Sequence, residues 1–375
     1  MIIWLGIIVT LSYLIIIGAL VYGLNKVKDF QLENILPKTR FSVVIPFRNE
    51  ALNLPSLLKS VIDLQYPKDL FEIIFIDDES TDNSIEIINS FNASEELNAI
   101  VIKNKRNTNS PKKDAITKAV SVAKNKWIIT TDADCILPKY WLDCFDEFIQ
   151  KTNAKCIVAP VIYEANNTLL EKFQLLNILS LQGTTIGSFG IDKPFLCNGA
   201  NFAYTKQLFI ELNGFHGNST IASGDDIFFL EKALKKHKNH VKYLKCHQAI
   251  VATKPELNWS DLISQNIRWA TKTSAYSIWL GKFIGILVLL MNAQIVIFLI
   301  LSIINIVSLK AFFWILILKF GIDFHFISRT SVFFNQKRIL KSFPLSFLIY
   351  PFFSVYVAFL SVFKDYKWKG RTFKK

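Results

Sequence analysis

The first 23 residues restrict the fold more than any other part of the chain. Met1–Gly23 contains no charged residue, and about 20 consecutive apolar residues in a helix are enough to cross the hydrocarbon core of a bilayer. A cleaved signal peptide would instead have a basic start, a shorter apolar core and a small-residue cleavage site. We therefore predict an uncleaved transmembrane anchor over residues 1–24.

More apolar segments follow in the last quarter of the chain, so residues 283–363 are predicted to contain the C-terminal membrane segments. They are Phe283–Leu309, Ala311–Ile327, which Lys319 and Asp323 interrupt, and Pro344–Phe363. Charged groups inside a membrane are costly unless they are satisfied. Asp323 and His325 therefore either line an acceptor site or belong to a segment that does not cross.

Basic residues lie next to these apolar segments. The chain has 43 Lys and Arg against 30 Asp and Glu, a net charge of +13, and the excess follows the first span, separates the last two and fills the tail 364–375. Basic segments that flank membrane spans are usually cytoplasmic. We therefore predict that the globular part and the tail face the cytoplasm and that the chain is an inner-membrane protein. The partners of this charge are expected to be anionic lipid headgroups and not nucleic acid.

The tail position limits the number of crossings. Three full crossings after a cytosolic globular part would leave the basic tail outside. Either the interrupted segment 311–327 or the last segment, which contains Pro351, is therefore predicted to be re-entrant or interfacial.

Residues 38–257 are predicted to form the globular domain. Short apolar runs at 41–47, 71–78, 99–104 and 126–134 indicate buried strands, and helical patterns begin near Glu50, Thr81, Pro111 and Pro138. Ser80 or Thr81 is the expected N-cap of the second helix. Strands joined by helices predict an α/β fold with a doubly wound sheet, which binds ligands beyond the carboxyl ends of its strands.

Two further features concern the rest of the chain. Residues 258–280 have apolar and basic residues at helical spacing and are predicted to form an amphipathic helix at the membrane surface. The five cysteines lack metal or disulfide spacing, so we expect reduced and mostly buried thiols. They are Cys135, Cys144, Cys156, Cys197 and Cys246.

Three pairs of acids stand where the chemistry is expected. Asp132 and Asp134 follow a predicted strand, and two carboxylates on one side of a strand end would suit Mg²⁺ or Mn²⁺. The pairs Asp77–Asp78 and Asp225–Asp226 stand at a second strand end and a helix start, where capping is the alternative explanation. No GxxxxGK[ST] pattern occurs, which argues against a P-loop phosphotransferase.

The motifs taken in order resemble those of the family 2 glycosyltransferases. These are membrane-anchored enzymes of the GT-A fold that transfer a sugar from a nucleotide-sugar donor with inversion, so the resemblance implies a GT-A doubly wound mixed sheet flanked by transmembrane helices. The matching stretches are VVIPFRNE (43–50), IDDESTD (76–82), PKKDAI (111–116), TTDAD (130–134), CNGANFAY (197–204), GDD (224–226), QNIRW (265–269) and, in the tail, WKGR (368–371).

The resemblance also implies a role for each matching residue. Pro46, Arg48 and Glu50 would frame the nucleotide pocket, and Asp78, helped by Asp77, would bind the base and ribose. Lys112 or Lys113 would approach the diphosphate, with the choice left open because Pro111 replaces the glycine of the family pattern. Asp132 and Asp134 would hold the metal against the donor. Asp226, beside Asp225, would be the general base, and Gln265, Arg268 and Trp269 would serve the diphosphate and the acceptor.

The prediction for the whole chain is a metal-dependent, inverting glycosyltransferase that uses a UDP-sugar and a membrane lipid acceptor. A processive polysaccharide synthase is the alternative, although the small number of C-terminal spans argues against a secretion channel. A third possibility, from another class, is an inactive membrane scaffold with the same fold.

Overall fold

The computed structural model describes residues 2–95, 97–164, 168–218, 223–273, 276–368 and 371–373. Its packing divides the chain into two units. The sheet unit consists of 28–164 and 196–254, and the helical unit consists of 1–27, 165–195 and 255–375. Residues 168–195, which lie inside the predicted globular domain 38–257, thus belong to the unit of the apolar helices and not to that of the sheet.

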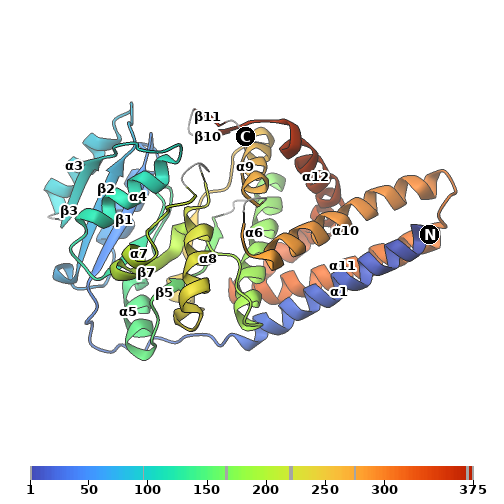
Figure 1. Cartoon of the computed structure of the whole chain (residues 1–375), viewed down its shortest axis with the longest axis horizontal. Coiled ribbons are helices and arrows are strands. Elements are labelled where there is room, and N and C mark those ends of the chain that lie inside the picture. Colours follow the sequence, from blue (N-terminus) through green and yellow to red (C-terminus); the bar gives the residue numbers. More distant parts are fainter. Residues whose placement is uncertain are drawn as a thin grey trace. The chain divides into compact units, whose positions relative to one another are not determined.

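The sheet unit is built on a mixed sheet. Within the described ranges, seven strands lie in the order β3-β2-β1-β4-β7-β5-β8 (Figure 1). β1 pairs in parallel with β2 and β4, whereas β7 runs antiparallel to β4 and β5, so the predicted α/β mixed sheet is confirmed. The strands are β1 Phe41–Phe47, β2 Phe71–Asp77, β3 Ala99–Lys103, β4 Trp127–Thr130, β5 Cys156–Val158, β7 Phe202–Thr205 and β8 Val241–Tyr243; β6 Val161–Tyr163 and β9 Val251–Thr253 form a separate parallel pair.

Helices cover both faces of this sheet. Alternate side chains of β1, such as Val43 and Ile45, belong to the core that contains the apolar residues of α2 and α5, while Val44 between them is buried outside that cluster. The sheet-unit helices are α2 Leu54–Ile62, α3 Ser84–Glu95, α4 Pro111–Val122, α5 Trp141–Lys151, α7 Lys206–Glu211 and α8 Asp225–His237.

The start of α3 differs from the prediction. The helix begins at Ser84, and the Asp82 carboxylate accepts the Ser84 N–H at 3.1 Å. Ser80 Oγ is used elsewhere, because it accepts the Asn49 N–H at 3.0 Å. The expected cap at Ser80 or Thr81 is therefore wrong by several residues, since both residues belong to the loop that joins β2 to α3.

The cysteines match the prediction. All five are free thiols, four of them buried and Cys197 partly exposed.

Two acids of α5 hold the segment that leads into the sheet unit. Glu147 accepts the backbone N–H groups of Glu33 and Ile35 at 2.9 and 3.1 Å, and Asp146 accepts that of Thr39 at 2.9 Å. Both acids are at least 98% buried. Buried carboxylates need such partners, so α5 fixes the path of the chain ahead of β1.

A neighbouring acid of α5 predicts a pH effect on stability. Burial raises the pKa of Asp143 from 3.8 to about 6, and its Oδ2 has no hydrogen-bond partner among the described residues. The folded state thus holds this proton up to about pH 6, and its stability declines as pH rises from about 4 to 6. Because Asp143 is partly exposed, we expect Asp143→Asn to gain only about 1 kcal/mol at pH 7.

Denaturant unfolding of the detergent-solubilised chain at several pH values measures this effect. The advantage of Asp143→Asn should vanish below about pH 4, where both side chains are neutral. A difference that stays constant with pH would contradict the shifted pKa.

The helical unit contains the four apolar helices. Among the described residues, four helices are long and apolar enough to cross a membrane: α1 Ile2–Lys26, α10 Trp279–Ile303, α11 Leu309–Phe333 and the stretch Lys337–Phe363, which includes α12 Phe343–Phe363. The predicted second span, 283–309, is displaced because Asn305 has φ +60° and ends the helix, and Ser308 caps the next one. The remaining elements are α6 Leu169–Gly190, α9 Trp259–Thr273, β10 Tyr366–Trp368 and β11 Arg371–Phe373.

Glycines let α1 and α6 approach closely. A Cβ placed on Gly187 would lie 2.5 Å from the Leu20 carbonyl oxygen. A Cβ on Gly23 would collide with the Gly187 carbonyl, and one on Gly190 would collide with the Gly23 carbonyl. Small residues are what helix contacts of this kind require. α6 is therefore an integral part of the helical unit.

The last helix, α12, packs against α9 along its second half. Val357 and Leu360 share one apolar cluster with Leu262 and Ile267 of α9, and Figure 1 shows the end of α12 beside α9. We propose that α12, which contains Pro351, is the segment that does not cross the membrane fully, as the position of the basic tail requires. The WKGR motif lies partly outside the described residues.

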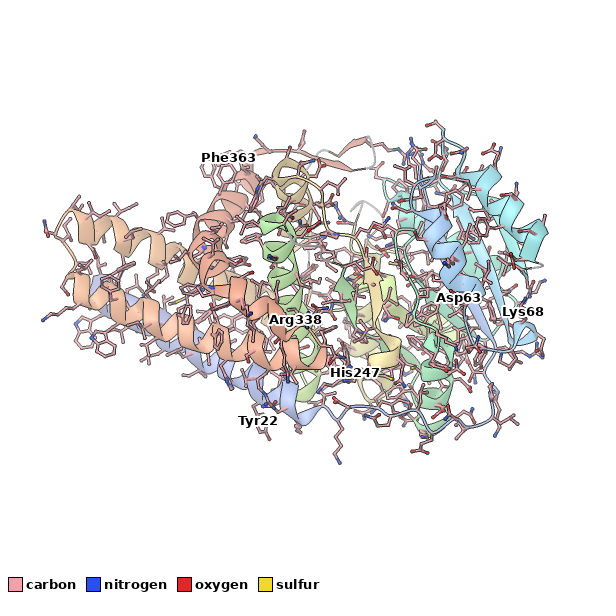
Figure 2. The ribbon with its side chains drawn as sticks, turned by 180° about the vertical axis from the view of Figure 1, so that it is seen from behind. Tyr22, Asp63, Lys68, His247, Arg338 and Phe363 are labelled. Atoms are coloured by element: carbon pink, nitrogen blue, oxygen red, sulfur yellow. The ribbon has the colours of Figure 1, made fainter. Side chains whose placement is uncertain are left out.

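Basic groups gather at one end of the long helices. Arg329 of α11 donates to the Asn25 side chain of α1 at 2.8 Å, so both helices end together. Figure 2 shows Tyr22 and Arg338 toward this same end. The positive-inside rule assigns such an end to the cytoplasm, and this orientation stays a prediction.

Candidate active site

One lysine and three acids meet at the carboxyl edge of the sheet. Lys112, in the first turn of α4, has its Nζ 2.6 Å from Asp132 Oδ1 and 3.5 Å from Asp225 Oδ2. Burial lowers the pKa of Lys112, but the Asp132 and Asp225 carboxylates and the nearby Asp226 raise it above its ordinary value. The ammonium is thus charged at every physiological pH, and it balances acids that would otherwise repel one another.

Gly199 brings Asp226 to this group. The Gly199 N–H donates to Asp226 Oδ2 at 3.0 Å, and the Gly199 carbonyl accepts the Thr130 hydroxyl at 2.8 Å, at the end of β4. A Cβ on Gly199 would lie 3.1 Å from Asp225 Oδ2 and 3.5 Å from Lys112 Nζ. The glycine of the CNGAN stretch therefore leaves room for the charged cluster, and it links the start of α8 to the sheet edge.

The GDD stretch places its acids through backbone geometry. Gly224 has φ +84° and precedes the first turn of α8, a conformation that glycine adopts without strain. Asp225 and Asp226 then occupy the helix start, where the helix dipole favours negative charge. Asp225 is buried and Asp226 is partly exposed, so Asp226 is the more accessible of the two.

The structure distinguishes the two adjacent lysines. Lys113 is 2% exposed, its Nζ donates to the Asn218 carbonyl at 2.7 Å, and it lies 4.8 Å from the centre of the Phe228 ring. It therefore supports the loop before α8, whereas Lys112 faces the acids. Among the described residues, Lys112 is the lysine paired with Asp132 and Asp225.

The DxD acids lie in a turn and not in a strand. β4 ends at Thr130, and the Cys135 N–H donates to the Asp132 carbonyl at 3.2 Å to close a turn. The idea that Asp132 and Asp134 share a face through strand periodicity is therefore wrong, since the turn places them. Asp132 has a side chain 36% exposed and Asp134 is partly buried.

Asp78 forms a second polar group at the end of β2. Its Oδ1 accepts from Arg106 Nε and from Asn104 Nδ2, each at 2.9 Å, and the side chain is 10% exposed. Arg48 donates to the carbonyls of Asp78 and Glu79. This group presents a carboxylate and a guanidinium side by side, which suits a planar ligand with donors and acceptors.

The other predicted nucleotide residues shape the loops around Asp78. Asp77 Oδ1 accepts the Ser80 N–H at 2.8 Å, and Glu50 Oε2 accepts the Asn53 amide at 2.7 Å. Pro46 pairs in register with Ile76 in the neighbouring strand β2. Asp77 thus fixes the loop backbone, whereas Glu50 bonds to a side chain and Pro46 belongs to strand β1.

The QxxRW residues lie in the helical unit, on α9. Gln265 Nε2 donates to Glu256 Oε1 at 2.8 Å, while Arg268 and Trp269 are partly buried on the same helix. The motif therefore belongs to a different unit from the acids, and its role remains a prediction.

Arg106 and Asn104 were not predicted from the sequence. Both lie in the loop after β3, where no periodic pattern marks them. The position of Asn104 one residue beyond β3, at the same sheet edge as Asp78, is the signal that would have found it.

Comparison with known proteins agrees with this architecture. Residues 42–213, which include Asp78, Lys112 and Asp132, match the family described as Glycosyl transferase family 2. The segment 42–213 thus carries a domain of this family. The predicted family and its α/β fold are thereby confirmed.

Two relatives and one solved structure show the extent of the likeness. A probable glycosyltransferase YdaM of Bacillus subtilis is 28% identical over 48% of this chain and 44% of its own length. A poly-beta-1,6-N-acetyl-D-glucosamine synthase of Staphylococcus epidermidis is 26% identical over 45% and 41%. The match thus spans about two fifths of the length of these relatives. A mannosyltransferase from Pyrobaculum calidifontis has the same fold, with TM-score 0.55, 15% identity and coverage of 93% and 99%.

Proposed function

We propose that this family 2 protein is an inverting glycosyltransferase that moves a sugar from a UDP-sugar to a membrane lipid acceptor. The observation that carries the proposal is the cluster of Lys112 with Asp132, Asp225 and Asp226 at the sheet edge. It combines a fixed positive charge for a leaving diphosphate with a partly exposed carboxylate for an acceptor proton. A sugar transfer needs both groups.

Asp226 is the proposed general base. Its Oδ2 is oriented by the Gly199 N–H, and it would accept the proton of the acceptor hydroxyl as that oxygen bonds to the sugar carbon. The bond from this carbon to the diphosphate breaks on the opposite side, so the configuration inverts. The nucleoside diphosphate leaves with the bonding electrons, and Lys112 lowers the cost of its charge.

The group around Asp78 is the proposed base pocket. A uracil ring would offer its imide N–H to the Asp78 carboxylate and its carbonyl oxygens to the Arg106 guanidinium. These two side chains form an ion pair, with Asp78 Oδ1 2.9 Å from Arg106 Nε. Arg48 fixes the backbone beside them. We assign the nucleotide to this pocket, with Pro46, Glu50 and Asp77 as its supporting residues.

Asp132 and Asp134 are the proposed ligands of Mn²⁺ or Mg²⁺. Asp132 Oδ1 contacts the Lys112 ammonium and the side chain is 36% exposed, so Oδ2 is the oxygen that Asp132 would offer to a hard cation. No group of three or more His, Cys, Asp or Glu side chains suited to a metal occurs among the described residues. Such an ion takes its remaining ligands from phosphate and water, and it would neutralise the diphosphate. The fold relative was solved with GDP-Man and Mn²⁺, in agreement with this assignment.

The helical unit supplies the proposed acceptor side. Its four apolar helices support a membrane-bound enzyme, with the sheet unit on the cytosolic side. Arg268 is the proposed second cation for the diphosphate, because a guanidinium stays charged in a partly buried site. Trp269 and Gln265 are the proposed acceptor-side residues.

The Asp134→Ala variant tests the reaction. We expect donor binding that depends on Mn²⁺ in the parent and is lost in the variant, because one of two protein ligands is gone. Calorimetric titration with a panel of nucleotide sugars, with and without EDTA, measures this and names the donor. Asp63→Ala, an exposed acid labelled in Figure 2, is the control. Equal turnover by parent and Asp134→Ala would reject the proposed role of the DxD acids.

A processive polysaccharide synthase is the second candidate. The relative named as a poly-beta-1,6-N-acetyl-D-glucosamine synthase supports it. Product length on purified enzyme separates the two: single transfer gives one product, and a ladder of oligomers would favour the synthase.

A further inference from the structure

A polar cavity lies inside the helical unit. It has a volume of about 100 Å³ and is lined by residues of α1, α6, α10, α11 and α12. Most of its wall is aliphatic and aromatic, as expected between apolar helices. Its polar groups are therefore the exception that requires an explanation, since polar groups among such helices are costly and usually functional.

One face of α6 supplies three of these groups. Asn177, Ser180 and Thr184 all line the cavity, and their spacing of three and four residues puts them on the same side of the helix. The flanking residues Leu176, Ile178 and Leu179 are buried and apolar. α6 thus turns a narrow uncharged polar stripe toward the cavity.

The charged groups of the cavity cancel each other. Lys319 Nζ donates to Asp323 Oδ2 at 2.6 Å, and the Tyr13 hydroxyl donates to Asp323 Oδ1 at 2.6 Å. Lys319 is 2% exposed and also faces the rings of Tyr13 and Phe347. The pair adds hydrogen-bonding capacity without net charge. Of the two residues expected in an acceptor site, Asp323 lines the cavity, while His325 is exposed on the outside of α11.

Ser346 of α12 is the group that points to a ligand. It lines the cavity and is 4% exposed, and its Oγ has no hydrogen-bond partner within the described residues. A buried hydroxyl without a partner costs free energy. A ligand oxygen or N–H in the cavity would satisfy it.

The cavity is connected to the QxxRW helix within the same unit. Phe173 of α6 lines the cavity and packs on Trp259 of α9 with ring centres 5.4 Å apart. Its neighbour Gln174 exchanges two hydrogen bonds with the Glu256 backbone, and the Glu256 side chain accepts from Gln265. The cavity wall and the helix that carries the proposed acceptor residues are thus joined by ring packing and hydrogen bonds.

We infer that this cavity binds the polar end of an uncharged lipid, a lipid alcohol such as a diacylglycerol. The inference rests on the proposed lipid acceptor and specifies its class. A lipid phosphate monoester, such as a polyprenyl phosphate, would bring a charge of about −1.5 to −2, and the lysine of the lining is neutralised at 2.6 Å. Hydroxyl, amide and carboxylate groups in an apolar wall match ester and hydroxyl oxygens on an apolar body.

A photoreactive diacylglycerol tests the site without any donor. The full chain in nanodiscs is labelled with a diazirine diacylglycerol, and the attachment sites are mapped by mass spectrometry. We expect labels on the cavity segments of α6, α11 and α12, displaced by unlabelled diacylglycerol and not by an equal amount of polyprenyl phosphate. Preferential displacement by polyprenyl phosphate would overturn the uncharged class, and labels elsewhere would overturn the site.

Matched variants separate binding from folding. Thr184→Val and Ser346→Ala each remove one hydroxyl from the cavity and should weaken diacylglycerol binding about three- to tenfold, as the loss of one hydrogen bond does. Thr185→Val and Ser361→Ala are controls, because those hydroxyls bond to carbonyls of their own helices at 2.9 and 2.7 Å and do not line the cavity. Equal binding by all four variants would contradict the inference.

The two proposals fail separately. Labelling of the cavity with no nucleotide-sugar turnover would leave the lipid site standing and reject the reaction. Turnover of nucleotide sugar with labels outside the cavity would support the reaction and reject the lipid site.

Discussion

Asp226→Asn is expected to bind the donor like the parent and to lose transfer by about 10²- to 10⁴-fold, the usual contribution of a general base. The Asp226 carboxylate accepts the N–H groups of Gly199 and Ile227 at 3.0 and 2.8 Å. The asparagine amide can accept only one of these N–H groups, so a loss of about 1 kcal/mol of folding stability should accompany the loss of the proton acceptor. Steady-state kinetics should therefore show a lower kcat with a donor KM changed by less than about threefold.

Two acid-to-amide controls make this result specific. Asp225→Asn removes a partner of Lys112 at 3.5 Å and is expected to change donor affinity more than kcat. Glu211→Gln alters an exposed acid that pairs with Lys236 and His237, and it should change neither. If Asp226→Asn transferred sugar at the parent rate while folded, the base would have to be another group.

The strands that carry the site could be predicted because their signals are local. β1 and β2 are mainly apolar runs, interrupted by Ser42 and Glu72, that are followed or closed by the polar residues Arg48 and Asp77, so both the strands and the edge where the acids gather follow from the sequence. β5, β7 and β8 have only three or four residues each, which is too short for a periodic pattern. The antiparallel strand β7, beside β4, therefore appears only in the structure.

The contacts within the site depend on information that no single segment contains. Gly199 and Asp226 are 27 positions apart in the sequence and form a hydrogen bond. Arg106 reaches Asp78 from a loop whose sequence has no periodic pattern. The acids of α5 look like an ordinary solvated helix face in sequence, yet they are buried against the 33–39 backbone. Such pairings are set by the packing of distant elements, so residue type alone cannot reveal them.

The choice between Lys112 and Lys113 leads to the second large prediction. Successive helical residues point about 100° apart, so the two lysines leave α4 in different directions, and Lys112 is the one paired with the acids. We expect Lys112→Met to lower kcat/KM by about 10²- to 10³-fold, the range seen when one group that stabilises a developing negative charge is removed. The side chain that remains is apolar, and the Asp132 and Asp225 carboxylates would then repel the diphosphate as well as each other.

Lys113→Met should behave in the opposite way. It removes the hydrogen bond to the Asn218 carbonyl and the charge over the Phe228 ring, so the expected loss is about 1–3 kcal/mol of folding stability, with kcat/KM within about threefold of the parent below the unfolding transition. Donor titration and thermal unfolding of the two variants, measured side by side, separate the roles. If Lys113→Met stayed folded but no longer bound donor, while Lys112→Met stayed active, Lys113 would be the lysine that contacts the diphosphate. The diphosphate would then lie on the side of α4 that faces α8.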